Sequence, residues 1–560
     1  MIRLIPWIAA AALLPQEPTP IDRQAVLREL RDFSPSGMGR RLGPDSTHFP
    51  RESKDEIPKI WMAPVKEGAK GRRYEIGGPW TKEAGDFSST QGQVLYAAEQ
   101  GIGVDRVTIL EWSNGCFSER PEPPWWGGFR PDPASKAWTG AGAPLFMARG
   151  MGSWANCGLI VFSSGLVATA GTCTAKGTDP TFKFPKGKLP TAISVTNKSE
   201  FALVTVVDTE NMKGQVAVLA LESSGKKTGF AHEWNDEHSS CLPNVAVLTG
   251  IKLLGYVDLP GIAFPTGVSA VGDSTQVRFN GPDGNAGLLR QADLSQQTWR
   301  DSFFKGSNSS YPSRSGFAVV ISKHEEKAAF LDLQPLFQKV RDLYFTTEEN
   351  FRKTRDPAQW PPTFEAEPGW KPPVVAVVDH PKPTAALATL GGGKKARAFV
   401  ASLDGQVRVY RVGGLATEAP ALAEEIAVEG TVQVGRNPVC LAYQKRSPDT
   451  FLALSRGDRE IAWVKYGEKE PQVIRRLRDA RLLDPVHVEV ADTHGIETAL
   501  LTVADFKGRK ILNYRYSEVV FATQGGARFG MGPAGKDEFE CGGFLEFPGP
   551  PFCISATNVN

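Results

Sequence analysis

The sequence lacks several features that would place it in a common class. It has no CxxC pair, which excludes the usual zinc-ribbon, thioredoxin-like and haem-attachment motifs. Its 64 basic residues are balanced by 62 acidic ones, for a net charge of +2, and no basic block or aromatic-interleaved basic patch is present. We therefore expect no nucleic-acid partner. No apolar run reaches the roughly 20 residues that a membrane-spanning helix needs, so we expect no integral membrane segment once the N-terminal segment is removed.

The N-terminal segment has the pattern of a signal peptide. Arg3 precedes an apolar run from Leu4 to Leu14, and small residues then lead into a proline-rich polar stretch. We predict a signal peptide over residues 1–20 and export to the periplasm or the extracellular space, where disulfides form. A short helix over 21–32 and an irregular segment to residue 85 follow in this interpretation.

The cysteine count is odd, so at least one thiol is free or pairs between chains. The seven cysteines are Cys116, Cys157, Cys173, Cys241, Cys440, Cys541 and Cys553. Closeness in sequence makes Cys157 with Cys173, and Cys541 with Cys553, the candidate bridges. Sequence alone leaves the connectivity open.

Glycine and proline are abundant, with 57 and 42 residues, which suits many short strands joined by turns. The stretch 188–224 shows the pattern best. It contains three runs rich in β-branched residues, over 191–196, 201–207 and 215–221, separated by Asn, Asp, Lys and Gly. The runs are almost continuously apolar, which predicts strands covered on both faces.

The same order of proline, strand, strand, turn and strand recurs along the chain. Three copies near the C-terminus have turn glycines at Gly405, Gly457 and Gly508, which are 52 and 51 residues apart. Seven units are recognised in all, near residues 93–112, 144–170, 190–221, 265–333, 383–410, 438–464 and 485–514. Stacked blades bury both faces of each sheet, so we predict an all-β fold, a seven-bladed β-propeller of four-stranded antiparallel blades.

This fold prediction sets the domain organisation. The propeller spans residues 86–520, and a helix is expected over 336–344 inside it. The C-terminal tail, residues 521–560, is predicted to close the ring by adding a strand to the first blade. Insertions interrupt the blades at about residues 113–143, 222–250, 274–314 and 334–373.

The blade sequences resemble those of secreted bacterial propellers of the YVTN and lactonase-like group. The resemblance rests on Pro-Thr-Ala-Ile-Ser-Val-Thr from Pro190, Phe-Ala-Leu-Val-Thr from Phe201, and Gly-Gln-Val-Ala-Val-Leu from Gly214. The signature Tyr-Val-Thr-Asn of that group is approximated by Leu203-Val-Thr-Val206. Such propellers include both enzymes and binding scaffolds, so the fold leaves function open.

A second, weaker resemblance is to a degenerate trypsin-like protease. Cys157-Gly-Leu-Ile with Val167-Ala-Thr-Ala-Gly-Thr-Cys173 resembles the region of the catalytic histidine, the run from Glu200 resembles the acid motif, and the run from Ser313 to Gly316 resembles the nucleophile loop. Thr172 stands where the general base is required, and a hydroxyl cannot accept the proton of Ser315 near neutral pH. The sequence therefore names no catalytic residue.

One segment has a composition suited to a divalent metal ion. His232, Asp236 and His238 lie within seven residues, and imidazole and carboxylate are metal ligands. A solvated loop is the alternative, and no other cofactor is predicted. His48, His324, His380, His487 and His494 are scattered singly, and we expect surface or turn positions for them.

Two functions from different classes fit the sequence. In the first, an exported, non-enzymatic scaffold binds a protein, glycan or surface partner through its long loops, with Trp125, Trp126 and Phe129 as candidate contacts. Aromatic residues in such a loop fit a plug of the channel mouth equally well. In the second, a lactonase-like or metal-dependent hydrolase has carboxylates and histidines lining the channel. The two differ in whether such groups converge at one channel mouth.

Overall fold

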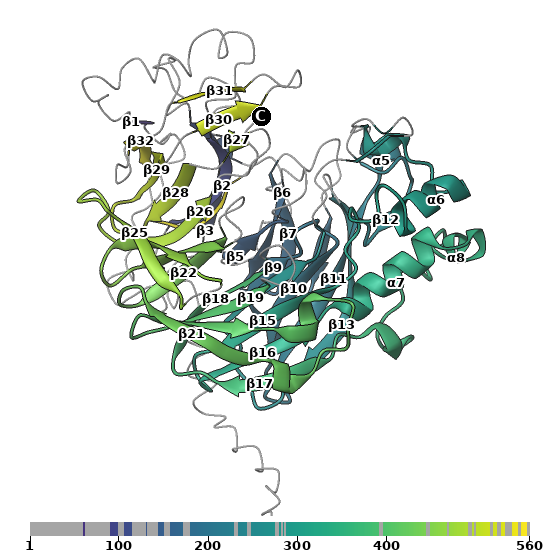
Figure 1. The fold of residues 1–560 in the computed structure, drawn as a ribbon, viewed down its shortest axis with the longest axis horizontal. Coiled ribbons are helices and arrows are strands. Elements are labelled where there is room, and N and C mark those ends of the chain that lie inside the picture. Colours follow the sequence, from purple (N-terminus) through teal and green to yellow (C-terminus); the bar gives the residue numbers. More distant parts are fainter. Residues whose placement is uncertain are drawn as a thin grey trace, which may run out of the picture.

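Small antiparallel sheets stand side by side in the computed structural model, in the manner of a β-propeller (Figure 1). The residues that the structure describes are 60–61, 90–98, 106–114, 130–131, 144–150, 157–171, 180–228, 233–243, 248–274, 279–281, 284, 287–390, 396–443, 449–467, 470–490, 496–497, 500–515, 519–522, 528–531, 540–546 and 550–556. The predicted signal peptide and the predicted helix over 21–32 lie outside these residues.

Six blades are built from strands taken in chain order, where seven were predicted. The first contains β5 (Pro144–Ala148), β6 (Cys157–Phe162), β7 (Leu166–Gly171) and β8 (Thr181–Lys183). The second contains β9 (Lys188–Val195), β10 (Phe201–Asp208), β11 (Lys213–Ser223) and β13 (Leu248–Asp258), and the short β12 (Ser239–Ser240) also pairs with β11. The third contains β14 (Gly267–Gly272), β15 (Gly316–Ser322), β16 (Lys327–Asp332) and β17 (Val374–Asp379).

The remaining three blades come from the C-terminal half. The fourth contains β18 (Pro383–Thr389), β19 (Arg397–Ser402), β20 (Gln406–Arg411) and β21 (Ala427–Gln433). The fifth contains β22 (Pro438–Tyr443), β23 (Thr450–Ser455), β24 (Glu460–Lys465) and β25 (Gln472–Arg478). The sixth contains β26 (Pro485–Val490), β28 (Leu500–Asp505), β29 (Lys510–Arg515) and β32 (Glu540–Glu546), with β1 (Ile60–Trp61) added at its edge.

The unit predicted as the first blade belongs to a sheet shared by the two ends of the chain. Its strands β2 (Thr90–Ala98) and β3 (Arg106–Asn114) are followed by β4 (Arg130–Pro131), and β33 (Pro551–Ala556) pairs with β2 on the other side. Strand β33 also lies beside β26 and β5. A separate three-stranded sheet consists of β27 (Ile496–Glu497), β30 (Val519–Ala522) and β31 (Arg528–Met531).

The middle strands of the blades are buried on both faces. All eight residues of β10 and all seven of β15 are buried. Neighbouring blades cover these faces because each sheet presents apolar side chains to both sides, which confirms the prediction drawn from the continuous apolar runs.

The innermost strands also contact one another through side chains. The Ala270 amide of β14 donates to Ser194 Oγ of β9 at 3.0 Å. One blade further on, the Ala388 amide of β18 donates to Ser269 Oγ of β14 at 2.9 Å. These bonds fix the position of each blade along the propeller axis relative to the next, since each joins the backbone of one innermost strand to a side chain of its neighbour.

The helices fall mainly within the insertions. They are α5 (Gly225–Thr228), η4 (Leu289–Gln291), α6 (Gln297–Phe304), α7 (Gln334–Phe345), α8 (Glu348–Lys353), η5 (Pro368–Trp370), η6 (Gly413–Ala416) and η7 (Ala423–Glu425). Helix α7 confirms the helix expected over 336–344. Within the described part of the chain, no helix has the length and apolar character needed to cross a membrane.

Candidate functional site

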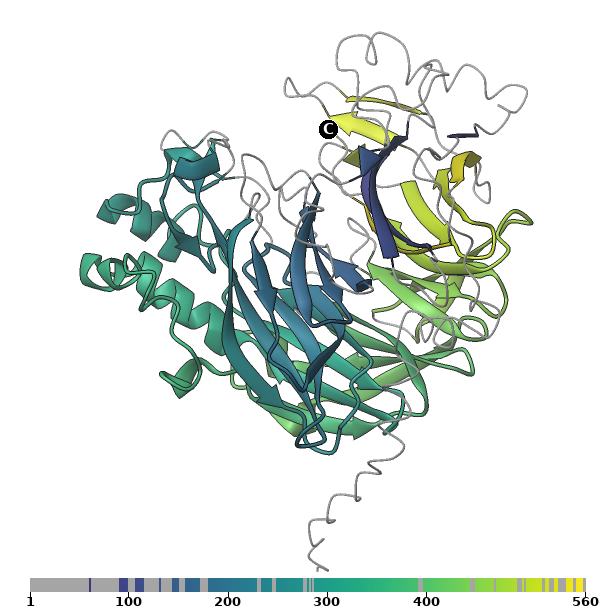
Figure 2. The same cartoon turned by 180° about the vertical axis from the view of Figure 1, so that it is seen from behind.

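Three insertions from neighbouring blades pack together into one unit beside the sheets. We call the described residues 224–243, 287–315 and 333–373 the insertion module. Figures 1 and 2 both show its helices α5, α6, α7 and α8 gathered at one side of the molecule, next to β11 and β13. Three of the four insertions predicted from sequence therefore form a shared structure.

An aromatic cluster forms the core of the module. The ring of Trp234, from the first insertion, lies 5.0 Å from that of Phe303 on α6 and 6.3 Å from that of Phe345 on α7. Tyr311 joins the cluster at 6.1 Å from Phe303. Because one ring or more comes from each insertion, the three segments stabilise one another and hold the connecting loops in place.

Local sequence signals set the helices of the module. Pro335 stands in the first turn of α7, where its missing N–H costs nothing, and the Gln334 amide donates to Asp332 Oδ1 at 2.9 Å. Thr347 caps α8 by accepting from the Asn350 amide at 3.2 Å. Helix α8 then ends beside the loop that contains Asp236.

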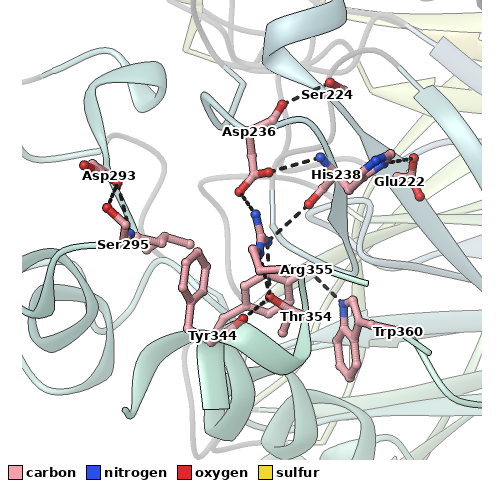
Figure 3. Close-up of polar contacts among 12 residues, drawn as sticks. Glu222, Ser224, Asp236, His238, Asp293, Ser295, Tyr344, Thr354, Arg355 and Trp360 are labelled. Carbon is pink, nitrogen blue, oxygen red and sulfur yellow. Dashed lines mark hydrogen bonds and ion pairs between the residues drawn. The ribbon is translucent and has the colours of Figure 1, made fainter. Parts of the chain in front are cut away.

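Arg355, just after α8, ties that loop to the helices. Its Nη1 forms an ion pair with Asp236, and its Nη2 donates to the His238 carbonyl at 3.4 Å (Figure 3). The guanidinium also lies over the ring of Phe351, 4.4 Å from the centroid. The side chains of Arg355 and Asp236 keep 31% and 17% of their surface exposed, so the pair sits at the boundary between core and solvent.

A second polar contact lies next to this one. His238 Nδ1 is 3.5 Å from Glu222 Oε1 at the end of β11, with 30% and 22% of the two side chains exposed. Ser240 donates to the other Glu222 oxygen at 3.1 Å, and the His238 amide donates to Asp236 Oδ1 at 3.1 Å. We call Glu222, Asp236, His238 and Arg355 the polar edge of the module. It presents acid, imidazole and guanidinium groups at defined, partly exposed positions (Figure 3).

Only two of the three predicted metal ligands are among the described residues. His232 lies outside the described residues, so the complete set with Asp236 and His238 stays a prediction. Asp236 is engaged by Arg355, and His238 faces Glu222. Across the residues that the structure describes, no group of three or more His, Cys, Asp or Glu is placed to hold a metal ion.

Trp125, Trp126 and Phe129 are outside the described residues, as are Cys173 and the side chains of Cys157 and Cys541. Cys553 is described and is a buried thiol rather than half of a disulfide. The predicted bridge between Cys541 and Cys553 is therefore wrong, because β32 carries Cys541 against β29 while β33 carries Cys553 against β2, in a different sheet.

The protease-like residues do not form a hydrolytic site. The strands that carry the resemblance belong to three separate blades, and Thr172 lies outside the described residues. Glu200 is buried in the turn between β9 and β10, where it accepts from Ser313 Oγ at 3.0 Å and from Thr196 Oγ1 at 2.7 Å. Burial raises the pKa of Glu200 above its usual value against the opposing effect of these hydrogen bonds. Its role is to join the second blade to the insertion module.

Two of the scattered histidines are buried, which corrects the expected surface or turn positions. His380 is fully buried between Tyr410 Oη, 2.8 Å from Nδ1, and Ser402 Oγ, 2.9 Å from Nε2. His487 lies in β26 with 8% of its surface exposed. Sequence missed both because a single histidine within an apolar pattern carries no signal of its burial.

A small cavity lies between the first and second blades. It measures about 10 Å³, and Arg149, Gly150 and Ser199 are among its lining residues. This volume holds about one water molecule. In its present shape the cavity does not accommodate a substrate ring.

No family model matches the chain, and no curated protein matches it. Solved structures with a similar fold include a protein from Lactobacillus plantarum, with 10% identity, coverage of 83% of this chain and 99% of that one, and a TM-score of 0.41. The periplasmic gluconolactonase of Pseudomonas aeruginosa has 12% identity, covers 84% and 100%, and has a TM-score of 0.39. The Swd1 β-propeller domain of Myceliophteria thermophila has 9% identity, covers 70% and 95%, and has a TM-score of 0.34. Similarities at this level carry no argument about function.

Proposed function

We propose that the protein is an exported propeller scaffold that binds a partner through its insertion module. The observation that carries this proposal is the polar edge, where two carboxylates, an imidazole and a guanidinium are held in place by an aromatic core and remain partly exposed. Insertions projecting from a rigid scaffold are a common location for binding sites. Preorganised side chains also reduce the entropy lost on binding.

A protein is the partner that the polar edge fits best among protein, glycan and surface partners. Acidic, imidazole and guanidinium groups within one small area complement a protein surface of mixed charge. Arginine is enriched among the residues that dominate such interfaces, and Arg355 is already oriented by Asp236 and Phe351. Export from the cell, proposed from the N-terminal segment, places this partner in the periplasm or outside the cell.

Cross-linking in the envelope and secreted fractions of the producing cell tests the proposal. A photo-reactive group at Glu237, which is exposed beside the polar edge, is expected to capture one protein reproducibly. His238→Ala should reduce that product at least tenfold. His324→Ala is the matched control because His324 lies in the turn between β15 and β16, away from the module, and it should leave the product unchanged.

The alternative function is lactonase-like or metal-dependent hydrolysis in the propeller channel. Hydrolysis of gluconolactone by the purified protein can be measured as base consumption at constant pH. A rate above the uncatalysed one, lost on chelation or on mutation of a channel-lining carboxylate or histidine, would favour this alternative. Equal cross-linking of wild type, His238→Ala and His324→Ala would contradict the binding role assigned to the polar edge.

A further inference from the structure

The C-terminal strand β33 has the features of an innermost blade strand. It begins at Pro551, as β5, β18, β22 and β26 begin at prolines. Proline suits the first residue of a strand because its missing N–H is not needed there. Strand β33 lies between the innermost strands β26 and β5, and on its outer side it pairs with β2.

In β22, β26 and β33, the side chain two residues after the first proline connects each innermost strand to the next. Cys440, two residues after the proline of β22, donates from Sγ to the Val488 carbonyl of β26 at 3.6 Å. Cys553, at the same position of β33, donates to the Met147 carbonyl of β5 at 3.5 Å. His487 occupies this position in β26, and its Nδ1 accepts from the Ile554 amide of β33 at 3.2 Å.

His487 differs from the two thiols because its bond requires an unprotonated nitrogen. Its ring packs edge-on against Phe146 of β5, with centroids 6.0 Å apart, and it is mostly buried. Burial lowers the pKa of His487 from 6.5 to about 4, since the charged imidazolium would lose its hydration. The imidazole is therefore neutral at pH 7, as the bond to Ile554 demands.

Among the described residues, few groups around His487 could offset a positive charge. The titratable residues on the strands packed against it are Cys440 and Tyr443 of β22, Cys553 of β33 and Asp505 of β28, and Glu489 follows on β26 itself. Strand β5 has none. Asp505 is engaged by the backbone amides of Leu483 and Asp484. None of these groups contributes to the shift in the pKa of His487, whose cause is burial.

We propose that β33 closes the ring and that His487 is an acid-sensitive latch on this closing strand. When Nδ1 gains a proton from solvent, it becomes a donor and faces the Ile554 amide, which is also a donor. The hydrogen bond is then lost, and a charge is left among apolar side chains. Strand β33 dissociates from β26, while the six blades built in chain order keep their own hydrogen bonds.

Hydrogen exchange of the backbone amides, corrected for the intrinsic effect of pH, tests the latch in the full chain. In the wild type, protection of the Ile554 amide should fall at least tenfold between pH 6.5 and pH 4, because this amide bonds His487. Residues 316–322 of β15 serve as the internal control and should keep their protection. This comparison needs no variant, so it remains decisive if a substitution prevents folding.

Two variants separate protonation from general acid destabilisation. His487→Asn places an amide oxygen near the position of Nδ1 and does not titrate, so it should retain protection of the Ile554 amide at pH 4. His487→Phe keeps the contact with Phe146 but removes the acceptor, and it should lose that protection already at pH 7. Equal loss at pH 4 in wild type and His487→Asn would overturn the proposal, as would unchanged protection in the wild type.

Discussion

At the scale of single residues, polar side chains at the end of the second strand of a blade bind the segment that enters the blade. Asp505 accepts from the Asp484 amide at 2.7 Å, and Ser455 donates to the Arg436 carbonyl at 2.6 Å. Ser402 instead bonds His380, 2.9 Å from Nε2. Asp404, in the turn after β19, accepts from the Gln406 amide at 3.1 Å and so stabilises that turn.

The neutral state of His380 gives a pH-dependent prediction. Burial, with a contribution from Arg408, lowers the pKa of His380 from 6.5 to about 4. The stability that depends on the neutral form is complete above pH 6.5 and is lost as pH falls toward 4, with a total of about 3 kcal/mol at about 1.4 kcal/mol per pH unit. Denaturant titrations should show a shallower fall in unfolding free energy over this range for His380→Gln than for wild type. Parallel curves would contradict the assignment.

Glu200 gives a prediction of opposite sign. Its pKa is raised by burial, so the folded state favours the protonated form, and the corresponding stability is present at low pH and lost as pH rises through the folded pKa. Glu200→Gln keeps an acceptor for Ser313 without a charge, and it should unfold at a higher temperature than wild type at pH 7 but not at pH 4. A lower melting temperature at pH 7 would show that the charge is stabilising.

At the scale of elements, the buried strands were predictable and the outermost strands were not. The predicted runs over 201–207 and 215–221 fall within β10 and β11, because their apolar residues are continuous and end at turns. Strands β21 and β25 were missed. Their residues alternate between partly buried and exposed, and β25 carries three arginines, so neither shows a core pattern. The polar edge could not be predicted from the sequence either, since Arg355 is 119 residues from Asp236.

The contact between the insertion module and the fourth blade gives a prediction at this scale. Glu418, between β20 and β21, pairs with Arg314 at 3.0 Å and with Arg341 of α7 at 3.5 Å. Glu418→Ala should increase hydrogen exchange in α7 several-fold. Because Glu418 is 48% exposed, unfolding free energy should change by only about 1 kcal/mol or less.

Glu349→Ala is the matched control for this change. Glu349 lies on α8, is 85% exposed and pairs with Lys353 one turn away. It should leave exchange in α7 unaltered. Equal exchange in the two variants would show that the Glu418 pairs do not hold the module against the fourth blade.

At the scale of the whole molecule, strands from the two ends of the chain meet in one sheet. The seven predicted units were counted along the sequence, so the contribution of β33 to a sheet with β2 could be expected only as a guess about the tail. Pairing between strands so far apart in the sequence leaves no local pattern. The proposed function also needs this closure, since the insertion module rests on blades whose positions the ring fixes.

The melting temperature of a chain that ends at Pro550 tests this closure most directly. Loss of the buried side chains of Phe552, Cys553 and Ile554, together with the pairing to β2, should lower stability by on the order of 5 kcal/mol. A chain ending at Ala556, which retains all of β33, is the control and should melt as the full chain does. Closure by β33 predicts a clearly lower melting temperature for the Pro550 chain alone, and equal melting temperatures for the two truncated chains would contradict it.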